Sequence, residues 1–190
     1  MDSTAIIEVL SRAVPAAGLE AVPSADGMPT IYVAAAQLVE TCLALRDLPE
    51  LRFAFLADLL AVDYLPREPR YEMVYLMVSL GVSGFGDSPK RLRVKVRVPA
   101  AEQASVPSVT SVWPSANWSE REAYDFFGLH FAGHPDLRRI LMPDDWDGHP
   151  LRKDYPVQIQ MKVKVYEPLQ VSQEQFVASI EATRERARND

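Results

Sequence analysis

The chain has 190 residues, enough for one domain with an appended segment and too few for a repeat array or a multidomain enzyme. Hydrophobic residues make up 48% and charged residues 24%, which excludes disorder of the whole chain. A net charge of −6 argues against nucleic acid as a partner. The single cysteine, Cys42, cannot by itself form a disulfide within the chain, a four-thiolate zinc site or an iron–sulfur cluster. We find no run that predicts a membrane span and no signal or transit peptide, so we expect a bacterial-type cytoplasm.

The first part of the chain predicts two helices separated by a short strand. The first helix can be capped by Ser3 or Thr4 and runs to about Ala13. Residues 30–33 predict the strand. In the second helix, apolar residues recur at helical spacing, so its cysteine is expected in the core rather than as a reactive thiol. This core stripe consists of Ala35, Leu38, Cys42 and Leu45.

Three strands are predicted in the middle of the chain. Residues 52–65 and 71–80 are largely apolar, as strands buried on both faces are, although the first run fits a helix equally well. Residues 90–98 alternate between apolar and basic, so one face packs and the other carries a ladder of cations. The ladder indicates a solvated or edge strand, or else a docking face for an acidic partner or nucleic acid. Its members are Arg91, Arg93, Lys95 and Arg97.

These elements predict an α+β fold: a single mixed sheet with helices packed on it, in a domain of residues 1–130. Prolines recur through residues 131–156, which predict a rigid extended segment with the composition of a partner-binding surface. Residues 157–190 form a tail with a strand followed by a terminal helix, whose start has the capping-box spacing of Ser172 and Gln175.

The segment before residue 130 predicts a helix that ends at Gly128, a residue suited to a left-handed cap. Ser119 and Glu122 have the capping-box spacing, although the helix can begin earlier. On a helical wheel, Glu120 falls with the aromatic residues, away from the polar face. That polar face carries Arg121, Glu122 and Asp125.

A carboxylate on an apolar helix face is costly unless it is paired. We therefore predict that Glu120 is neutralised by backbone N–H groups or by a cation. The nearest candidate cations in the sequence are Arg138 and Arg139.

The three histidines allow two interpretations. His130, His134 and His149 could bind a metal ion, and the alternative function is then a soluble metal-dependent hydrolase. Glycine and proline flank the last two, in two copies of Gly-His-Pro, so the local backbone is turn-like rather than helical. We favour turns whose imidazoles hydrogen-bond backbone groups, with no metal site.

Three runs, residues 120–128, 133–142 and 148–156, strongly resemble the C subunit of NADH:quinone oxidoreductase, the bacterial respiratory complex I. Residues 56–65 and 115–118 also resemble this family. The resemblance implies a hydrophilic core subunit of the peripheral arm, with no catalytic residues and no cofactor of its own. It implies a peripheral position on the cytoplasmic side of the bacterial inner membrane, with the membrane reached only through the complex.

The complex to which the resemblance points passes electrons from NADH to quinone through FMN and iron–sulfur clusters and translocates protons. The implied partners are the D subunit, which helps to form the quinone site, and neighbouring cluster-bearing subunits. We expect the chain to scaffold this quinone-site subunit. The candidate partner-interface residues are Glu120, Arg121, Glu122, Asp125, His134, Asp136, Arg138, Arg139, Asp144, Trp146, His149, Arg152, Lys153, Asp154 and Tyr155.

Overall fold

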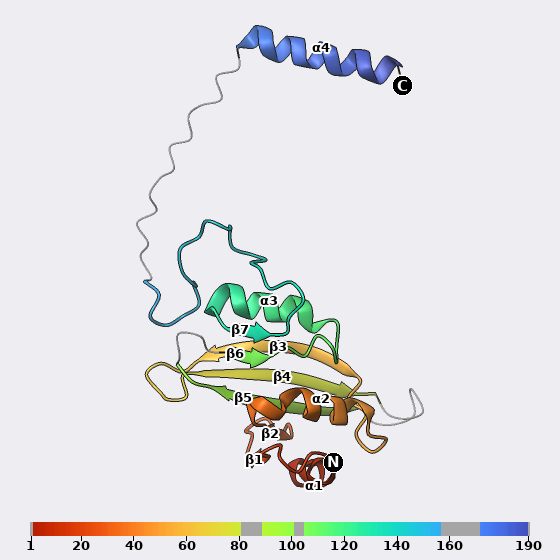
Figure 1. Cartoon of the computed structure of the whole chain (residues 1–190), viewed down its shortest axis with the longest axis vertical. Coiled ribbons are helices and arrows are strands. Elements are labelled where there is room, and N and C mark those ends of the chain that lie inside the picture. The colour runs from red at the N-terminus through yellow and green to blue at the C-terminus, as the bar shows by residue number, and fades with distance from the viewer. Residues whose placement is uncertain (1, 81–88, 101–104, 157–171, 190) are drawn as a thin grey trace. The chain divides into compact units, whose positions relative to one another are not determined.

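The computed structural model describes residues 2–80, 89–100, 105–156 and 172–189. The chain divides into two compact units, Met1–Tyr155 and Pro156–Asp190. Figure 1 shows the elements in chain order. They are α1 (Ser3–Ala13), β1 (Glu20–Val22), β2 (Thr30–Tyr32), the 3-10 helix η1 (Ala35–Gln37), α2 (Leu38–Asp47), β3 (Phe55–Asp63), β4 (Tyr71–Ser79), β5 (Lys90–Val98), β6 (Ser105–Pro107), α3 (Ala116–Phe127), β7 (His130–Ala132) and α4 (Gln173–Asn189).

The first unit is built on a five-stranded mixed sheet with the order β1-β2-β5-β4-β3. The strands β3, β4 and β5 pair antiparallel, whereas β2 pairs parallel with β5. The predicted α+β class is confirmed. The position of β5 corrects one expectation, because this strand lies inside the sheet and not at its edge. The edge beyond β4 belongs to β3.

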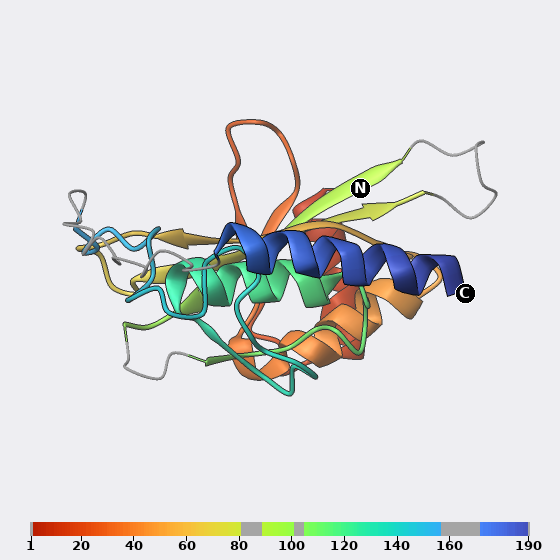
Figure 2. The ribbon, with the colours of Figure 1, turned by 90° about the horizontal axis from the view of Figure 1, so that it is seen from above.

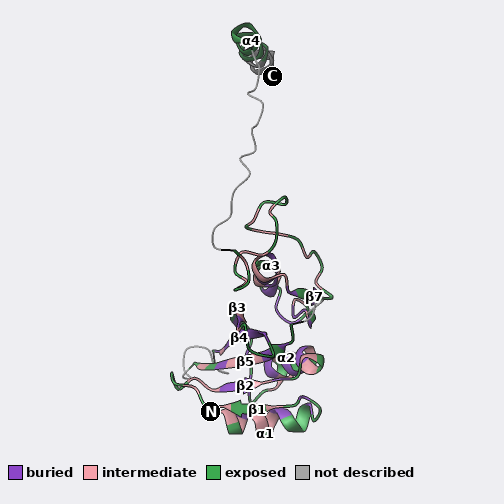
Figure 3. Ribbon diagram, turned by 90° about the vertical axis from the view of Figure 1, so that its left-hand side faces the viewer, coloured by how far each residue is buried: buried purple, intermediate pink, exposed green. Residues whose placement is uncertain are grey.

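One face of the sheet carries the core. The apolar residues of β5, from Leu92 to Val98, point to this face and are fully buried. Helix α2 covers it, with Leu38, Cys42 and Leu45 fully buried as predicted. The fourth predicted member of this stripe, Ala35, lies in η1 before the helix and is half-buried. Figure 3 shows α2 on one side of the stacked strands. Burial raises the pKa of the Cys42 thiol, so this cysteine is a core residue and not a nucleophile.

The opposite face of the sheet is not covered by any helix of the first unit, among the residues that the structure describes (Figure 3). In Figure 2, α2 and the loop of residues 23–29 lie on opposite sides of the sheet. We call this uncovered side the open face. It carries the cation ladder, and three of the four cations pair with carboxylates of the same unit. The pairs are Arg93–Asp26 at 2.6 Å, Lys95–Glu72 at 2.7 Å and Arg97–Glu20 at 2.9 Å.

The first apolar run forms a strand, β3, and not a helix. It is not buried on both faces as predicted, since Phe55 and Leu60 are exposed on the open face whereas Leu56 and Leu59 are buried on the other. The second run, β4, is buried along most of its length, as expected for an interior strand.

Two helix starts differ from the predicted ones. The cap of α1 is Asp2, whose carboxylate accepts the Ala5 N–H at 2.9 Å, while Ser3 Oγ instead accepts the Thr30 N–H at 3.1 Å. Helix α3 begins at Ala116, so Ser119 is not its cap. Its end is as predicted: Gly128 adopts a left-handed conformation with φ 72°.

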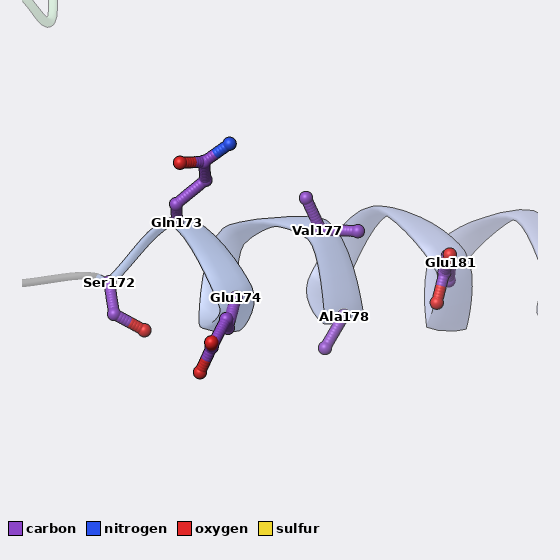
Figure 4. A pocket seen from close by; sticks show the side chains of 6 residues that line it. All are labelled: Ser172, Gln173, Glu174, Val177, Ala178 and Glu181. Carbon is purple, nitrogen blue, oxygen red and sulfur yellow. The ribbon is translucent and has the colours of Figure 1, made fainter.

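The second unit contains α4, whose start is a capping box as predicted. The Gln175 N–H donates to Ser172 Oγ at 3.2 Å, and the Ser172 N–H donates to Gln175 Oε1 at 3.1 Å. Figure 4 shows side chains of its first turns, around a hollow formed by this helix alone. A single helix face does not enclose a ligand, and we assign no site there. The predicted strand of residues 157–166 lies outside the described residues.

Candidate functional site

Residues 133–155, which we call the wrapped segment, contain no helix or strand, yet they belong to the same compact unit as the sheet. Their backbone and side chains contact α3 and the turn between β3 and β4. The contacts come in two groups, one around α3 and one around the β3–β4 turn. Together these contacts determine which side chains of residues 120–128, 133–142 and 148–156 point inward and which point outward.

Asp125 of α3 anchors the first half of the wrapped segment. Its carboxylate is fully buried and accepts the backbone N–H groups of Ile140, Leu141 and Met142 at 2.8–3.1 Å. Arg139 donates to it as well, at 2.9 Å. Burial raises the pKa of Asp125, but these four donors outweigh burial, and the pKa is lowered overall. Asp125 therefore stays ionised and holds the segment as a charged anchor.

Arg121 makes a second inward contact from the same helix. Its guanidinium donates to the backbone carbonyls of Arg138 and Arg139 at 3.2 and 3.0 Å. The guanidinium carbon, Cζ, also lies over the Trp118 ring, 5.3 Å from the ring centroid. Arg121 and Asp125 are both buried, although the helical wheel placed them on the polar face. The wheel failed here because the wrapped segment covers that face.

Glu120 is fully buried, as its place on the wheel predicted. Its partners are the Val109 N–H and the Ser108 hydroxyl, both at 2.7 Å. The predicted backbone N–H partner is confirmed, whereas Arg138 and Arg139 pair with Asp136 and Asp125 instead of with Glu120. Burial raises the pKa of Glu120 to about 7 against the opposing effect of these two hydrogen bonds. The carboxyl group therefore titrates near neutral pH.

The two Gly-His-Pro histidines hydrogen-bond backbone groups, as predicted. His134 Nδ1 accepts the Asp136 N–H at 3.0 Å, and its Nε2–H donates to the Asn117 carbonyl at 3.2 Å. These contacts select the neutral Nε2–H tautomer. His149 Nδ1–H donates to the Asp125 carbonyl at 2.8 Å.

His130 lies on β7, with Nδ1 at 3.3 Å from Ser105 Oγ. His134 and His149 thus bond carbonyls near opposite ends of α3, and His130 lies beside Ser105 of β6. Within the described ranges, no group of three or more histidine, cysteine, aspartate or glutamate side chains could hold a metal ion. The structure gives the hydrolase alternative no shared site.

Arg70 anchors the second half of the wrapped segment, a role that was not predicted from the sequence. Its guanidinium makes two hydrogen bonds to buried Asp63, at 2.8 and 3.1 Å, and two to Asp154, at 2.7 and 2.9 Å. The Lys153 N–H also donates to Asp63, at 2.9 Å. Burial raises the pKa of Asp63, but Arg70 and two N–H groups lower it to about 2 overall. The sequence feature that could have indicated this role is the pair Asp63 and Arg70, which lie at the two ends of the turn between β3 and β4.

Further contacts hold the end of the segment. The Arg152 guanidinium donates to the Tyr71 hydroxyl at 2.8 Å. The Leu151 N–H donates to the Phe126 carbonyl at 3.1 Å, and the Tyr155 hydroxyl to the Asp147 carbonyl at 2.9 Å. An irregular backbone is therefore fixed by side chains instead of by a helix or strand.

The candidate interface residues fall into two groups. Some point inward and make the contacts described above, and their role toward other subunits stays a prediction. Six others are exposed, although Asp136 pairs with Arg138 and Asp154 with Arg70. The inward group contains Glu120, Arg121, Asp125, His134, Arg139, His149, Arg152 and Tyr155, and the exposed group Glu122, Asp136, Arg138, Asp144, Lys153 and Asp154. Trp146 is half-buried, and its backbone carbonyl accepts a hydrogen bond from Arg139 at 3.1 Å.

Gly128 is needed both for its backbone conformation and for space. A Cβ atom there would lie 2.6 Å from Cδ2 and Nε2 of His149, whereas Gly133, with φ 82°, has nothing within 4 Å of such an atom. We expect Gly133→Ala to lower the free energy of unfolding by about 1 kcal/mol and Gly128→Ala by about 2 kcal/mol, since the second change also displaces His149. Urea unfolding of both variants checks this. Equal losses would show that His149 does not pack against the end of the helix.

Among the helices in the described part of the chain, none is long and apolar enough to cross a membrane.

Comparisons with known proteins identify the family. Residues 31–160 match the model described as respiratory-chain NADH dehydrogenase, 30 Kd subunit. The NADH-quinone oxidoreductase C subunit of Roseiflexus sp. (strain RS-1) is 46% identical over 158 residues, covering 83% of this chain and 86% of the relative. The protein of the same name from Geobacter sulfurreducens is 48% identical over 133 residues, covering 70% of this chain and 76% of the relative.

Two solved structures share the fold. A trypsin-resistant fragment of Nqo5 superposes with a TM-score of 0.57 at 35% identity and covers 70% of this chain and 99% of that fragment. A chain of the membrane-bound sulfane sulfur reductase, an archaeal respiratory membrane complex, superposes with a TM-score of 0.65 at 24% identity, covering 90% and 96%. The family model and the relatives together show that the chain belongs to the respiratory-chain NADH dehydrogenase 30 Kd subunit family, the C subunit family of NADH-quinone oxidoreductase, respiratory complex I.

Proposed function

We propose that this chain is a core subunit of the peripheral arm of complex I that binds no cofactor and scaffolds the quinone-site subunit. In this proposal, FMN and the iron–sulfur clusters that carry electrons from NADH to quinone lie in other subunits. The chain is peripheral, on the cytoplasmic side of the bacterial inner membrane, and is held there by the complex. Its enzymatic role is that of a subunit, without catalytic residues of its own.

The observation that carries the proposal is the anchoring of the wrapped segment. Asp125 and Arg70 fix an irregular backbone from inside, so the outward residues are already ordered before a partner binds. A preorganised surface loses less conformational entropy on association. Apolar side chains are among those outward residues: Leu141 is 61% exposed and Leu151 53%. Such residues, beside the exposed arginine and lysine of the same segment, suit a contact with another subunit.

The proposal predicts a loss of assembly without a loss of turnover. We expect Leu141→Asp to weaken the contact with the quinone-site subunit by roughly 2 kcal/mol, about 30-fold in affinity, because a charge replaces an apolar anchor. The measurement is the yield of complex recovered through a tag on this chain from gently solubilised membranes, with NADH:quinone activity per recovered FMN. The matched control is Leu43→Asp on α2, where the leucine is also exposed.

Two results would contradict the scaffold. One is a full yield of complex with reduced activity per FMN, which would indicate a direct role at the quinone site. The other is recovery of the wild-type chain alone, without flavin- and cluster-bearing subunits.

A further inference from the structure

A groove runs between β3 and α3. Its cavity is about 250 Å³. We call it the edge groove, because one wall is the edge strand of the sheet. The Leu151 N–H bond to Phe126 holds the wrapped segment at one end of it. The residues that matter for its chemistry are Asp58, Leu60, Glu122, Phe126, Phe127 and Leu151.

The walls of the edge groove are apolar and incompletely covered. Leu60 is 37% exposed and Leu151 is more than half exposed. The strand register places Phe55, which is also exposed, on the same side of β3 as Leu60, with Asp58 between them. An edge strand with exposed apolar side chains is a site where proteins bind other chains.

The rim of the groove is acidic. Asp58 and Glu122 are both exposed, and neither has an ion pair within the ranges that the structure describes. The contrast with the rest of the open face is clear, since Asp26, Glu72 and Glu20 each pair with a cation of β5. The acidic groups at the groove are therefore available to an external cation.

We propose that the edge groove binds a segment of another complex I subunit that carries apolar side chains and a lysine or arginine. The apolar side chains would contact Leu60, Phe126 and Leu151, and the basic residue would pair with Asp58 and Glu122. Burying the apolar surface supplies the affinity, and the charge pair fixes the register of the bound segment. This inference rests on the proposed function and names a second contact surface, separate from Leu141.

Thiol labelling tests occupancy of the groove. The native Cys42 is fully buried and its raised pKa keeps it protonated, so an introduced cysteine supplies the signal. We expect Leu60→Cys to react with a maleimide in the free full-length chain and at least tenfold more slowly in the purified complex. The matched control is Leu43→Cys on α2, since both leucines are 37% exposed. Its reaction shows that the reagent reaches the chain within the complex.

The outcomes separate the two proposals. Recovery of the chain without other subunits would overturn the proposed function. Recovery of the complex with Leu60→Cys reacting as fast as in the free chain would overturn the edge groove and leave the scaffold standing.

A photoreactive residue in place of Leu151 tests the chemistry of the occupant. We expect an adduct with a peptide of another subunit that contains apolar residues and a lysine or arginine. An adduct with residues 157–190 of this chain, with a second copy of it, or with an acidic peptide would overturn the proposal. The double variant Asp58→Lys, Glu122→Lys should weaken that crosslink at least fivefold, whereas Glu50→Lys, at an exposed turn before β3, should leave it unchanged.

Discussion

Replacing Asp125 by alanine should lower the free energy of unfolding of the free chain by about 3–5 kcal/mol, the range typical of a buried charge left without its partner. The change would leave three backbone N–H groups without their acceptor. It would also remove the carboxylate partner of the Arg139 guanidinium, which keeps only the carbonyls of Trp146 and Gly148. The wrapped segment would then lose its main anchor on α3. Urea unfolding measures the stability, and limited proteolysis between residues 133 and 155 reports on the segment.

Glu122→Ala is the control for this prediction, because Glu122 lies on the same helix and is exposed. We expect it to change stability by less than about 0.5 kcal/mol. Similar effects of the two variants, or an Asp125→Ala chain with a protease-resistant segment, would show that the segment is ordered by other contacts.

Replacing Glu120 by glutamine should flatten the dependence of stability on pH. The pKa of Glu120 rises from 4.5 to about 7 on folding. A raised carboxyl pKa contributes stability that is fully present below pH 4.5, is lost as the pH rises, and is absent above about pH 7. At 1.36 kcal/mol per pKa unit, the wild-type chain should lose about 2–3 kcal/mol between pH 5 and pH 8 through this group, and the variant none of it.

The measurement is the difference in unfolding free energy between variant and wild type at several pH values from 5 to 8. Glu122→Gln should follow the wild type throughout. A constant difference between Glu120→Gln and wild type would mean that Glu120 is ionised across the whole range.

The fold could be predicted from the sequence where buried residues recur at the regular spacing of a strand or a helix. The alternation of β5 and the core stripe of α2 both appear in the structure as predicted. The position of β5 inside the sheet could not be predicted from its local sequence pattern. It depends on parallel pairing with β2, about 60 residues earlier in the chain, and no local pattern encodes that contact.

The candidate site was predictable only in part, for a related reason. The Gly-His-Pro turns and the backbone partner of Glu120 followed from turn chemistry and from the cost of burying a charge. The burial of Asp125 and the role of Arg70 did not. A helical wheel treats polar residues as solvent-facing, and here an irregular segment covers them and uses them as anchors.

Photo-crosslinking from residue 141 in the assembled complex would test the central claim most directly. We expect a photoreactive residue in place of Leu141 to form its main adduct with the quinone-site subunit. An adduct only with other subunits, or none in a fully assembled and active complex, would contradict the scaffolding role of the wrapped segment.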